Sequence, residues 1–153
     1  MEYTIAVNQD QLKEAGNLFN EYANSLNISL EFQNFNEELK IINSMYGSPT
    51  GCLLLVYENK EAVACAAYRK IGENVCELKR MYIKPNFRGL GIGQNLLTLL
   101  CDKAKLNGYT LMRLDTLDSM LPALKLYRNN GFYDINAYYH NPNEGVVYLE
   151  KSL

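Results

Sequence analysis

Residues 74–105 read NVCELKRMYIKPNFRGLGIGQNLLTLLCDKAK, and this stretch carries the strongest structural signal in the chain. Its first part, up to Ile83, is rich in apolar and aromatic residues, which is typical of a buried strand. Pro85 ends that strand because proline has no N–H to donate to a neighbouring strand. Apolar residues at helical spacing follow from Ile92, and Gly108 suits the position just beyond a helix C-terminus. The stretch therefore predicts a strand, a loop and a helix in succession.

The loop between that strand and that helix is Arg-Gly-Leu-Gly-Ile-Gly, residues 88–93. Glycine tolerates positive φ and leaves room for a ligand to approach the main chain. The N–H groups of such a loop can converge at the positive end of the following helix, which favours a diphosphate. A guanidinium at its start suits phosphate oxygens as well. We expect the diphosphate of a ligand to contact Arg88, Gly89, Leu90, Gly91, Ile92, Gly93 and Gln94.

Two other phosphate-binding motifs fit this loop less well. A mononucleotide P-loop needs Lys followed by Ser or Thr after its last glycine, whereas Gln94 and Asn95 stand here. A dinucleotide fingerprint needs G-x-G-x-x-G, but the residue three beyond Gly91 is Gln94. A glycine loop without any ligand role is the remaining alternative.

A second motif lies downstream, where residues 123–132 read ALKLYRNNGF. The two motifs resemble the pyrophosphate loop and the A-x-x-L-Y-x-x-x-G-F signature of the GCN5-related N-acetyltransferase (GNAT) family, which uses acetyl-coenzyme A. The resemblance implies acetyl-coenzyme A as the acyl donor. It also implies that main-chain groups of Met81, Tyr82 and Ile83 bind the thioester and pantetheine. Thr116 and Arg128 are expected as further contacts of coenzyme A.

The same resemblance implies two catalytic side chains. Tyr127 occupies the family's tyrosine position, where a phenol with a pKa near ~10 donates a proton to the leaving thiolate. Glu77 matches the strand carboxylate that histone-acetylating members use to deprotonate the amine. Lys79 and Arg80 are close in sequence, so Glu77 as a base and Glu77 as a structural ion-pair partner both stay open. Proton transfer through ordered water is a third alternative.

Neither a covalent acyl-enzyme nor a metal site is expected. Four cysteines are scattered without a C-x-x-C pair, which favours reduced, buried thiols: Cys52, Cys65, Cys76 and Cys101. Cys76 adjoins Glu77, but neighbouring residues of a strand point to opposite faces of the sheet. His140 is the only histidine, which argues against a His-based metal site.

Length and composition are those of one globular domain covering residues 1–153. Hydrophobic residues make up 48% and charged residues 21% of the chain, so disorder is not indicated. A net charge of −2 without a Lys/Arg cluster argues against nucleic acid and anionic membranes as partners. No apolar run approaches ~18 residues and the N-terminus lacks a secretion signal pattern, so a cytoplasmic protein is expected.

The hydrophobic pattern of the whole chain predicts the order β-α-α-β-β-β-α-β-α-β-β. The first helix follows an Asn8 cap and ends near Ser25, a loop covers 27–34, and a second helix runs from an Asn36 cap to Gly47. A final hairpin is predicted from residues 132–139 and 146–151. This order is also that of the GNAT family. It predicts an α/β, single-domain acyl-CoA N-acyltransferase fold with a central mixed sheet flanked by helices.

The sequence thus predicts transfer of an acetyl group from acetyl-coenzyme A to a primary amine of a small molecule or peptide, by direct attack in a ternary complex. Two alternatives stay open: a non-catalytic acyl-CoA-binding sensor or partner module, and an acyltransferase with a longer acyl donor. The mild acidity of the chain weakly favours a cationic or neutral amine. An exposed strand of the final hairpin offers an edge to a second subunit, so a homodimer is one option.

Overall fold

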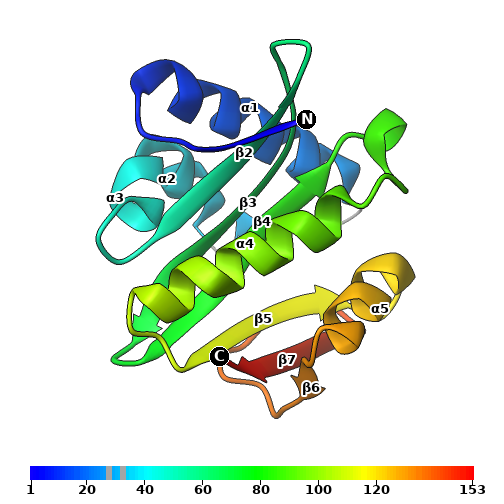
Figure 1. Ribbon diagram of the computed structural model, residues 1–153. Helices are drawn as coiled ribbons and strands as arrows, with labels where there is room; N and C mark the ends of the chain where they lie inside the picture. Colours follow the sequence, from blue (N-terminus) through cyan, green and yellow to red (C-terminus); the bar gives the residue numbers. More distant parts are fainter. Residues whose placement is uncertain (27–28, 32–33) are drawn as a thin grey trace.

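The strands of the protein pair in one mixed sheet in the computed structural model, which describes residues 1–26, 29–31 and 34–153 (Figure 1). The order across the sheet is β1 (Glu2–Ile5), β2 (Cys52–Glu58), β3 (Glu61–Gly72), β4 (Val75–Ile83), β5 (Leu111–Leu117), β7 (Val146–Ser152) and β6 (Tyr133–Asp134). The β4–β5 pair is parallel and the other pairs are antiparallel. The predicted mixed sheet flanked by helices is therefore confirmed.

Helices cover both faces of this sheet (Figure 1). They are α1 (Gln9–Ser25), α2 (Phe35–Lys40), α3 (Ile42–Tyr46), α4 (Ile92–Leu106) and α5 (Leu121–Asn129), with a 3₁₀ turn at Pro85–Phe87. In Figure 1, α4 crosses in front of the strands, whereas α1, α2 and α3 lie behind them. None of the helices in the described residues is both long and apolar enough to cross a bilayer.

The central strands are buried on both faces, because strand residues alternate between two cores. Leu54 and Val56 of β2 pack in the core shared with α4 and α5. Leu53 and Leu55, between and beside them, pack in the core shared with α1 and α3. This two-sided burial explains why β2 reads as a continuous apolar run.

The helical segment before β2 differs from the prediction. A single helix from an Asn36 cap was expected, but the chain forms α2 and α3 with a break at Ile41. Ile41 has φ −125° and ψ 29° and is 46% exposed. Two β-branched residues in a row, Ile41 and Ile42, favour a helix poorly, which is consistent with a break there. The expected loop over 27–34 lies partly outside the described residues.

The final hairpin is also shorter than predicted. Its first strand was expected over 132–139, but β6 covers Tyr133–Asp134 alone and forms the edge of the sheet. The chain leaves the sheet after β6, and the hydroxyls of Tyr138 and Tyr139 then donate to the carboxylates of Glu77 on β4 and Asp115 on β5. These contacts place residues 138–141 beside the site described next.

Candidate active site

The site is an opening between β4 and β5. Their parallel pairing runs from Val75 opposite Leu111 to Glu77 opposite Arg113. Beyond that point the strands diverge, and residues of both strands line a cavity of about 700 Å³. A bulge bends β4 here: its register against β3 shifts, and Arg80 takes a positive φ of 57°. The bulge beside the opening therefore lies in β4, the strand predicted from residues 74–83 of the sequence.

The glycine loop borders the cavity at the start of α4. Gly89 and Gly91 have φ of 78° and 81°, and a Cβ added to either would meet nothing within 4 Å among the described atoms. Packing therefore does not account for these glycines, whereas the backbone conformation and room for a ligand do. Gly93 differs, since a Cβ there would lie 3.2 Å from Leu126 Cδ2. That glycine allows α4 and α5 to pack closely.

Arg88 and Gln94 are held at the two ends of the loop. The Nε of Arg88 donates to the carbonyl oxygen of Ile83 over 2.9 Å, and its guanidinium lies 5.9 Å from the Tyr82 ring centroid. Gln94 exchanges side-chain hydrogen bonds with Asn130, at 2.7 and 2.9 Å. These contacts link the loop to the end of β4 and to the end of α5.

Tyr127 places a phenol at the cavity wall. It lies on α5, packs edge-on against Phe132, and its hydroxyl lies 3.8 Å from Met81 Sδ. Burial raises the pKa of Tyr127 well above its ordinary value, followed by smaller effects of Tyr22 and Asp115. The hydroxyl is therefore protonated at neutral pH and available as a donor.

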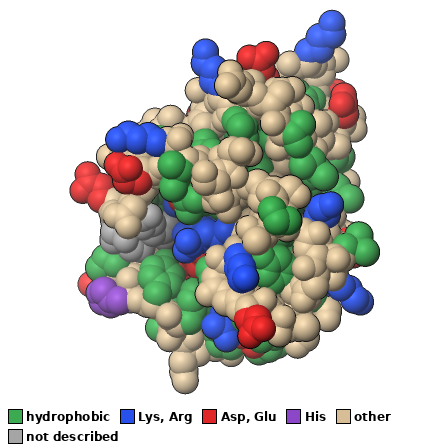
Figure 2. Space-filling view, turned by 90° about the vertical axis from the view of Figure 1, so that its left-hand side faces the viewer, with side chains coloured by type: hydrophobic (Ala, Val, Ile, Leu, Met, Phe, Trp, Pro, Cys, Tyr) green, Lys and Arg blue, Asp and Glu red, His purple; other side chains and the backbone are tan. Residues whose placement is uncertain are grey.

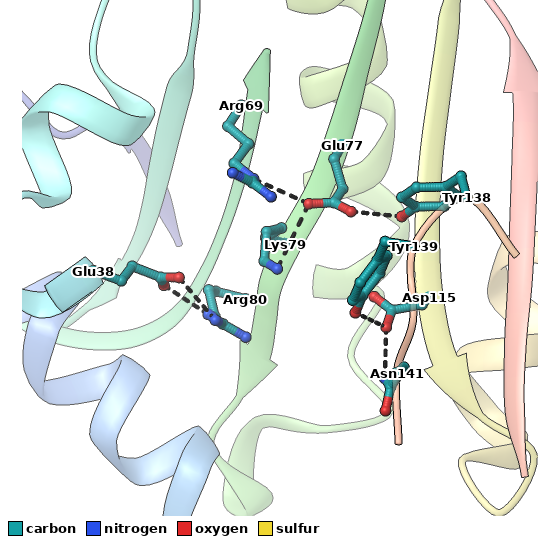
Figure 3. Close-up of polar contacts among 9 residues, drawn as sticks. All are labelled: Glu38, Arg69, Glu77, Lys79, Arg80, Asp115, Tyr138, Tyr139 and Asn141. Atoms are coloured by element: carbon teal, nitrogen blue, oxygen red, sulfur yellow. Dashed lines mark hydrogen bonds and ion pairs between the residues drawn. The ribbon is translucent and has the colours of Figure 1, made fainter. Parts of the chain in front are cut away.

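Glu77 lies in a buried network and is 1% exposed. Its Oε1 accepts from Arg69 Nε at 3.0 Å and lies 3.6 Å from Lys79 Nζ, while Tyr138 donates to Oε2 at 2.6 Å (Figure 3). Burial pushes the pKa of Glu77 upward, but Lys79, Tyr138 and Arg69 outweigh it and hold the pKa below its usual value. Glu77 is thus ionised and fully partnered.

Arg80 pairs with Glu38 and not with Glu77. Its Nε and Nη2 donate to the two oxygens of Glu38 at 2.7 and 2.8 Å, and its guanidinium lies 5.1 Å from the Phe35 ring centroid. The pair joins β4 to α2 (Figure 3). Sequence reasoning missed Glu38, because an acidic residue in a short exposed-looking helix gives no sign of a distant buried partner.

A third carboxylate, Asp115 of β5, also lines the cavity. Its Oδ2 accepts hydrogen bonds from the hydroxyl of Tyr139 and, at 2.8 Å, from Nδ2 of Asn141. Figure 3 shows these residues facing Lys79 across the space between β4 and β5. Asn141, a cavity-lining residue, gave no sequence signal beyond its place in a turn.

Most of the residues predicted for coenzyme A line this one cavity: Met81, Tyr82, Ile83, Arg88, Gly89, Gly91, Gly93, Gln94 and Thr116. The others lie elsewhere. The Leu90 side chain is 61% exposed, and Ile92 is in the core. Arg128 points to Asp134, with Nη2 3.2 Å from Oδ1. The described residues contain no group of His, Cys, Asp and Glu arranged to hold a metal ion.

The fold, the glycine loop and the opening between β4 and β5 are together those of an acyl-coenzyme A N-acyltransferase. The model of the acetyltransferase (GNAT) family matches residues 15–132, and the chain belongs to that family. It is 40% identical over 138 residues to a Schizosaccharomyces pombe protein named as an uncharacterized N-acetyltransferase, covering 89% of this chain and 85% of that one.

Solved structures share the fold over nearly the whole chain. An acetyltransferase from Streptococcus agalactiae superposes with a TM-score of 0.83 at 23% identity, covering 99% of this chain and 98% of that one. A PaiA N-acetyltransferase from Thermoplasma acidophilum, solved in complex with coenzyme A, superposes with a TM-score of 0.75 at 19% identity over 100% of both chains. The predicted acyl-CoA N-acyltransferase fold is therefore confirmed.

Proposed function

We propose that the protein transfers an acetyl group from acetyl-coenzyme A to a primary amine of a small molecule or peptide, by direct attack of the bound amine. The opening between β4 and β5 is the observation that supports this most. The glycine loop and Tyr127 border it on the face of α4 and α5, and Lys79, Arg80 and Asp115 border it on the other face. Donor and acceptor that enter from opposite faces meet in one opening, as direct attack requires.

The donor side of the cavity fits a diphosphate followed by an extended chain. Gly89 and Gly91 hold positive φ with open space in front of them, directly before the N-terminus of α4. The positive end of that helix favours an anion, and the Arg88 guanidinium lies at the cavity wall. Thr116 is on the β5 side of the same path.

The thioester would lie along β4 beyond its pairing with β5. Met81, Tyr82 and Ile83 line the cavity there, on the edge where β5 has diverged. A main-chain N–H held by a sheet costs little reorganisation when it stabilises an oxygen that gains charge. We assign the stabilisation of the thioester carbonyl oxygen to this segment.

An amine that binds as an ammonium ion first loses one proton to water, and the reaction of the neutral amine then needs two proton transfers. The lone pair of the amine nitrogen forms the C–N bond to the carbonyl carbon, and the C–S bond breaks with its electron pair going to sulfur. Tyr127 donates its hydroxyl proton to that sulfur, and the proton that leaves the nitrogen passes to water. Tyr127 regains a proton from solvent, so the products are an amide and a free thiol.

We assign Glu77 a positioning role rather than that of the base. Its carboxylate accepts from Arg69 and Tyr138 and lies beside Lys79, and its pKa is lowered. A base with a lowered pKa takes a proton from an ammonium poorly at neutral pH. Its contacts support it as the group that fixes Lys79 and Tyr138 beside the cavity.

The cysteines support direct attack over an acyl-enzyme. Cys76, next to Glu77, is buried in the core with α4, and burial raises its pKa to about 12. Burial also raises the pKa of Cys52, to about 11. Thiols with such pKa values contain almost no thiolate at neutral pH and are poor nucleophiles.

The test is release of free coenzyme A thiol from acetyl-coenzyme A with a panel of small and peptide amines. Amine-dependent thiol release, with the acetylated amine identified by mass, is the expected result. Tight binding of acetyl-coenzyme A without thiol release for any amine would instead favour a sensor module. Propionyl- and succinyl-coenzyme A are run beside the acetyl donor, and faster turnover with either would reassign the donor.

A further inference from the structure

We propose that the acceptor is an amino acid: its carboxylate is bound by Lys79 and Arg80, and its ammonium group by Asp115. This assignment rests on the proposed function and names the substrate class of the same site. It differs from the cationic or neutral amine that the overall acidity of the chain favoured. The argument depends on which charges face the cavity, since the net charge of the molecule does not describe them.

The three residues share the sheet face opposite α4. Leu78 of β4 and Leu114 of β5 pack in the core shared with α4 and α5. Because side chains alternate along a strand, the adjacent Lys79 and Asp115 point to the other face. Arg80 follows Lys79 at the bulge, where the alternation is broken, and reaches Glu38 of α2 on that same face. The donor-binding glycine loop lies on the α4 side, so this second group is placed for the acceptor rather than for the donor.

Charged side chains of both signs line the cavity wall. Lys79, Arg80 and Arg88 line the cavity together with one carboxylate, Asp115. The carboxylates of Glu77 and Glu38, which pair with Lys79 and Arg80, are not part of that wall in the described structure. Figure 2 shows Lys and Arg side chains set in a hollow between hydrophobic side chains. The wall therefore presents cations and a carboxylate at separate places, which suits a ligand that carries both charges.

Arg80 is held rigidly enough to serve as an anchor. Two of its five N–H donors bind Glu38 in a fork, and the Phe35 ring packs on the guanidinium. Arg80 is 5% exposed and has a positive φ of 57°. A residue with a Cβ persists in this backbone conformation when the surrounding structure enforces it. A pre-positioned guanidinium binds a carboxylate without losing further rotamer freedom.

Asp115 supplies the opposite charge across the opening. The hydroxyl of Tyr139 and the amide of Asn141 both donate to its Oδ2, which fixes the carboxylate toward the cavity that it lines. A fixed carboxylate facing fixed cations matches the two charges of a zwitterion. A peptide N-terminus has an ammonium group for Asp115 but no adjacent carboxylate for Lys79 and Arg80.

The experiment compares each amino acid with its own carboxamide, for example glycine with glycinamide and aspartate with its diamide. Binding to the complex of protein and coenzyme A is measured by calorimetry, and kcat/KM is measured by thiol release. We expect the amino acid to be favoured about 10- to 100-fold, the range of a charge-assisted hydrogen bond. Equal or tighter binding of the carboxamides would overturn the proposal, as would no binding of any amino acid.

Two outcomes separate this proposal from the proposed function. Amino acids that bind the complex with the expected preference, but without thiol release, would support the acceptor assignment and reject catalysis. Amines acetylated without any preference for a carboxylate would support catalysis and reject the acceptor assignment.

Variants locate the effect at Lys79. Lys79→Gln should reduce the amino-acid-over-carboxamide ratio about 10-fold, chiefly through KM, with the affinity for coenzyme A retained. Lys70→Gln is the matched control, because Lys70 is exposed on neighbouring β3, and it should keep the ratio. Lys79→Arg keeps the charge, should keep most of the preference, and decides the case if Lys79→Gln folds poorly. A loss of coenzyme A affinity in Lys79→Gln would mean that the cations bind the donor.

Discussion

At the scale of single residues, the site depends on side chains whose burial sets their protonation. Tyr127 is buried beside Met81 with a raised pKa, so it stays protonated across the physiological range. Glu77 is buried with three partners and a lowered pKa, so it stays charged. Two buried polar groups are thus held in opposite states, the phenol of Tyr127 protonated and the carboxylate of Glu77 ionised.

The role of Tyr127 is tested by removing its hydroxyl. Tyr127→Phe keeps the ring packed against Phe132 and deletes the proposed donor to sulfur. We expect kcat to fall by about 10²-fold, the lower end for a general acid, with the dissociation constant of coenzyme A nearly unchanged. Pre-steady-state thiol release and calorimetry measure the two quantities. Unchanged turnover would reject the acid role.

Glu38 should matter for stability far more than its neighbour Glu37. Glu38→Ala leaves the buried Arg80 without its carboxylate, so the free energy of unfolding should fall by about 3–5 kcal/mol. Glu37→Ala removes an exposed pair with Lys40, in which both side chains are more than half exposed, and should change it by less than ~1 kcal/mol. Urea denaturation measures the free energy of unfolding of both variants. Similar decreases in the two variants would show that the buried Glu38–Arg80 pair stabilises the fold no more than the exposed Glu37–Lys40 pair.

At the scale of elements, the bulged β4 and the start of α4 form one unit. The bulge at Arg80 turns β4 away from β5, and the loop that follows returns the chain into α4 at Gly91. The donor path and the helix N-terminus therefore lie next to each other without a long connecting loop. The opposite end of α4 carries a second positive-φ glycine, Gly108, with φ 91°.

These two glycines provide a matched pair of variants. Gly91→Val and Gly108→Val place the same side chain in the same backbone region, with open space around the added Cβ in the described structure. Both should lose stability by a similar amount, about 1–3 kcal/mol, because of backbone strain. Gly91→Val alone should lose coenzyme A binding, measured by calorimetry. Retained affinity in that variant would mean that the loop does not bind the diphosphate.

At the scale of the whole molecule, buried charged contacts add links between distant stretches of chain to those made by the two cores. Glu77 connects β3 through Arg69 and the segment after β6 through Tyr138. Glu38 connects α2 to β4 through Arg80. These contacts join four separate stretches of chain beside the cavity, so the geometry of this region and the stability of the fold depend on the same ion pairs.

The pH dependence of stability follows from Glu77. Its folded-state pKa lies below the ordinary value of 4.5, so the folded state binds fewer protons than the unfolded state between these two values. The stabilisation is complete above pH ~4.5 and is lost as the pH falls through the lowered pKa. Glu77→Gln should therefore be less stable than the native chain, by about 3 kcal/mol at pH 7, and approach it at low pH. Urea titrations from pH 7 to 3 measure the free energy of unfolding of both chains, with Glu73→Gln, at an exposed position, as control. If the native chain and Glu77→Gln differed by the same amount at every pH, Glu77 would not be the cause of the pH dependence.

Sequence patterns predicted the sheet, the glycine loop and the helix of Tyr127, but they misjudged two segments. The break at Ile41 falls at two adjacent β-branched residues, and β6 ends before Tyr138 and Tyr139, whose hydroxyls donate to distant carboxylates. Arg80 donates to Glu38, and Tyr138 donates to Glu77, at sequence separations of 42 and 61 residues. Local sequence patterns cannot predict such contacts, because the two partners are much farther apart in the sequence than the length of one helix or strand.

By itself the sequence determined the unit of strand, glycine loop and helix, and the loop predicts a site for a diphosphate. Those features depend on local chemistry: proline that ends a strand, glycine that accepts positive φ, and apolar residues at helical spacing. The tertiary structure alone decided which charges meet beside the opening between β4 and β5, where Arg80 pairs with Glu38 and Asp115 accepts from Tyr139 and Asn141. The reason is physical, since the partner of a buried charge is selected by the packing of distant elements around it.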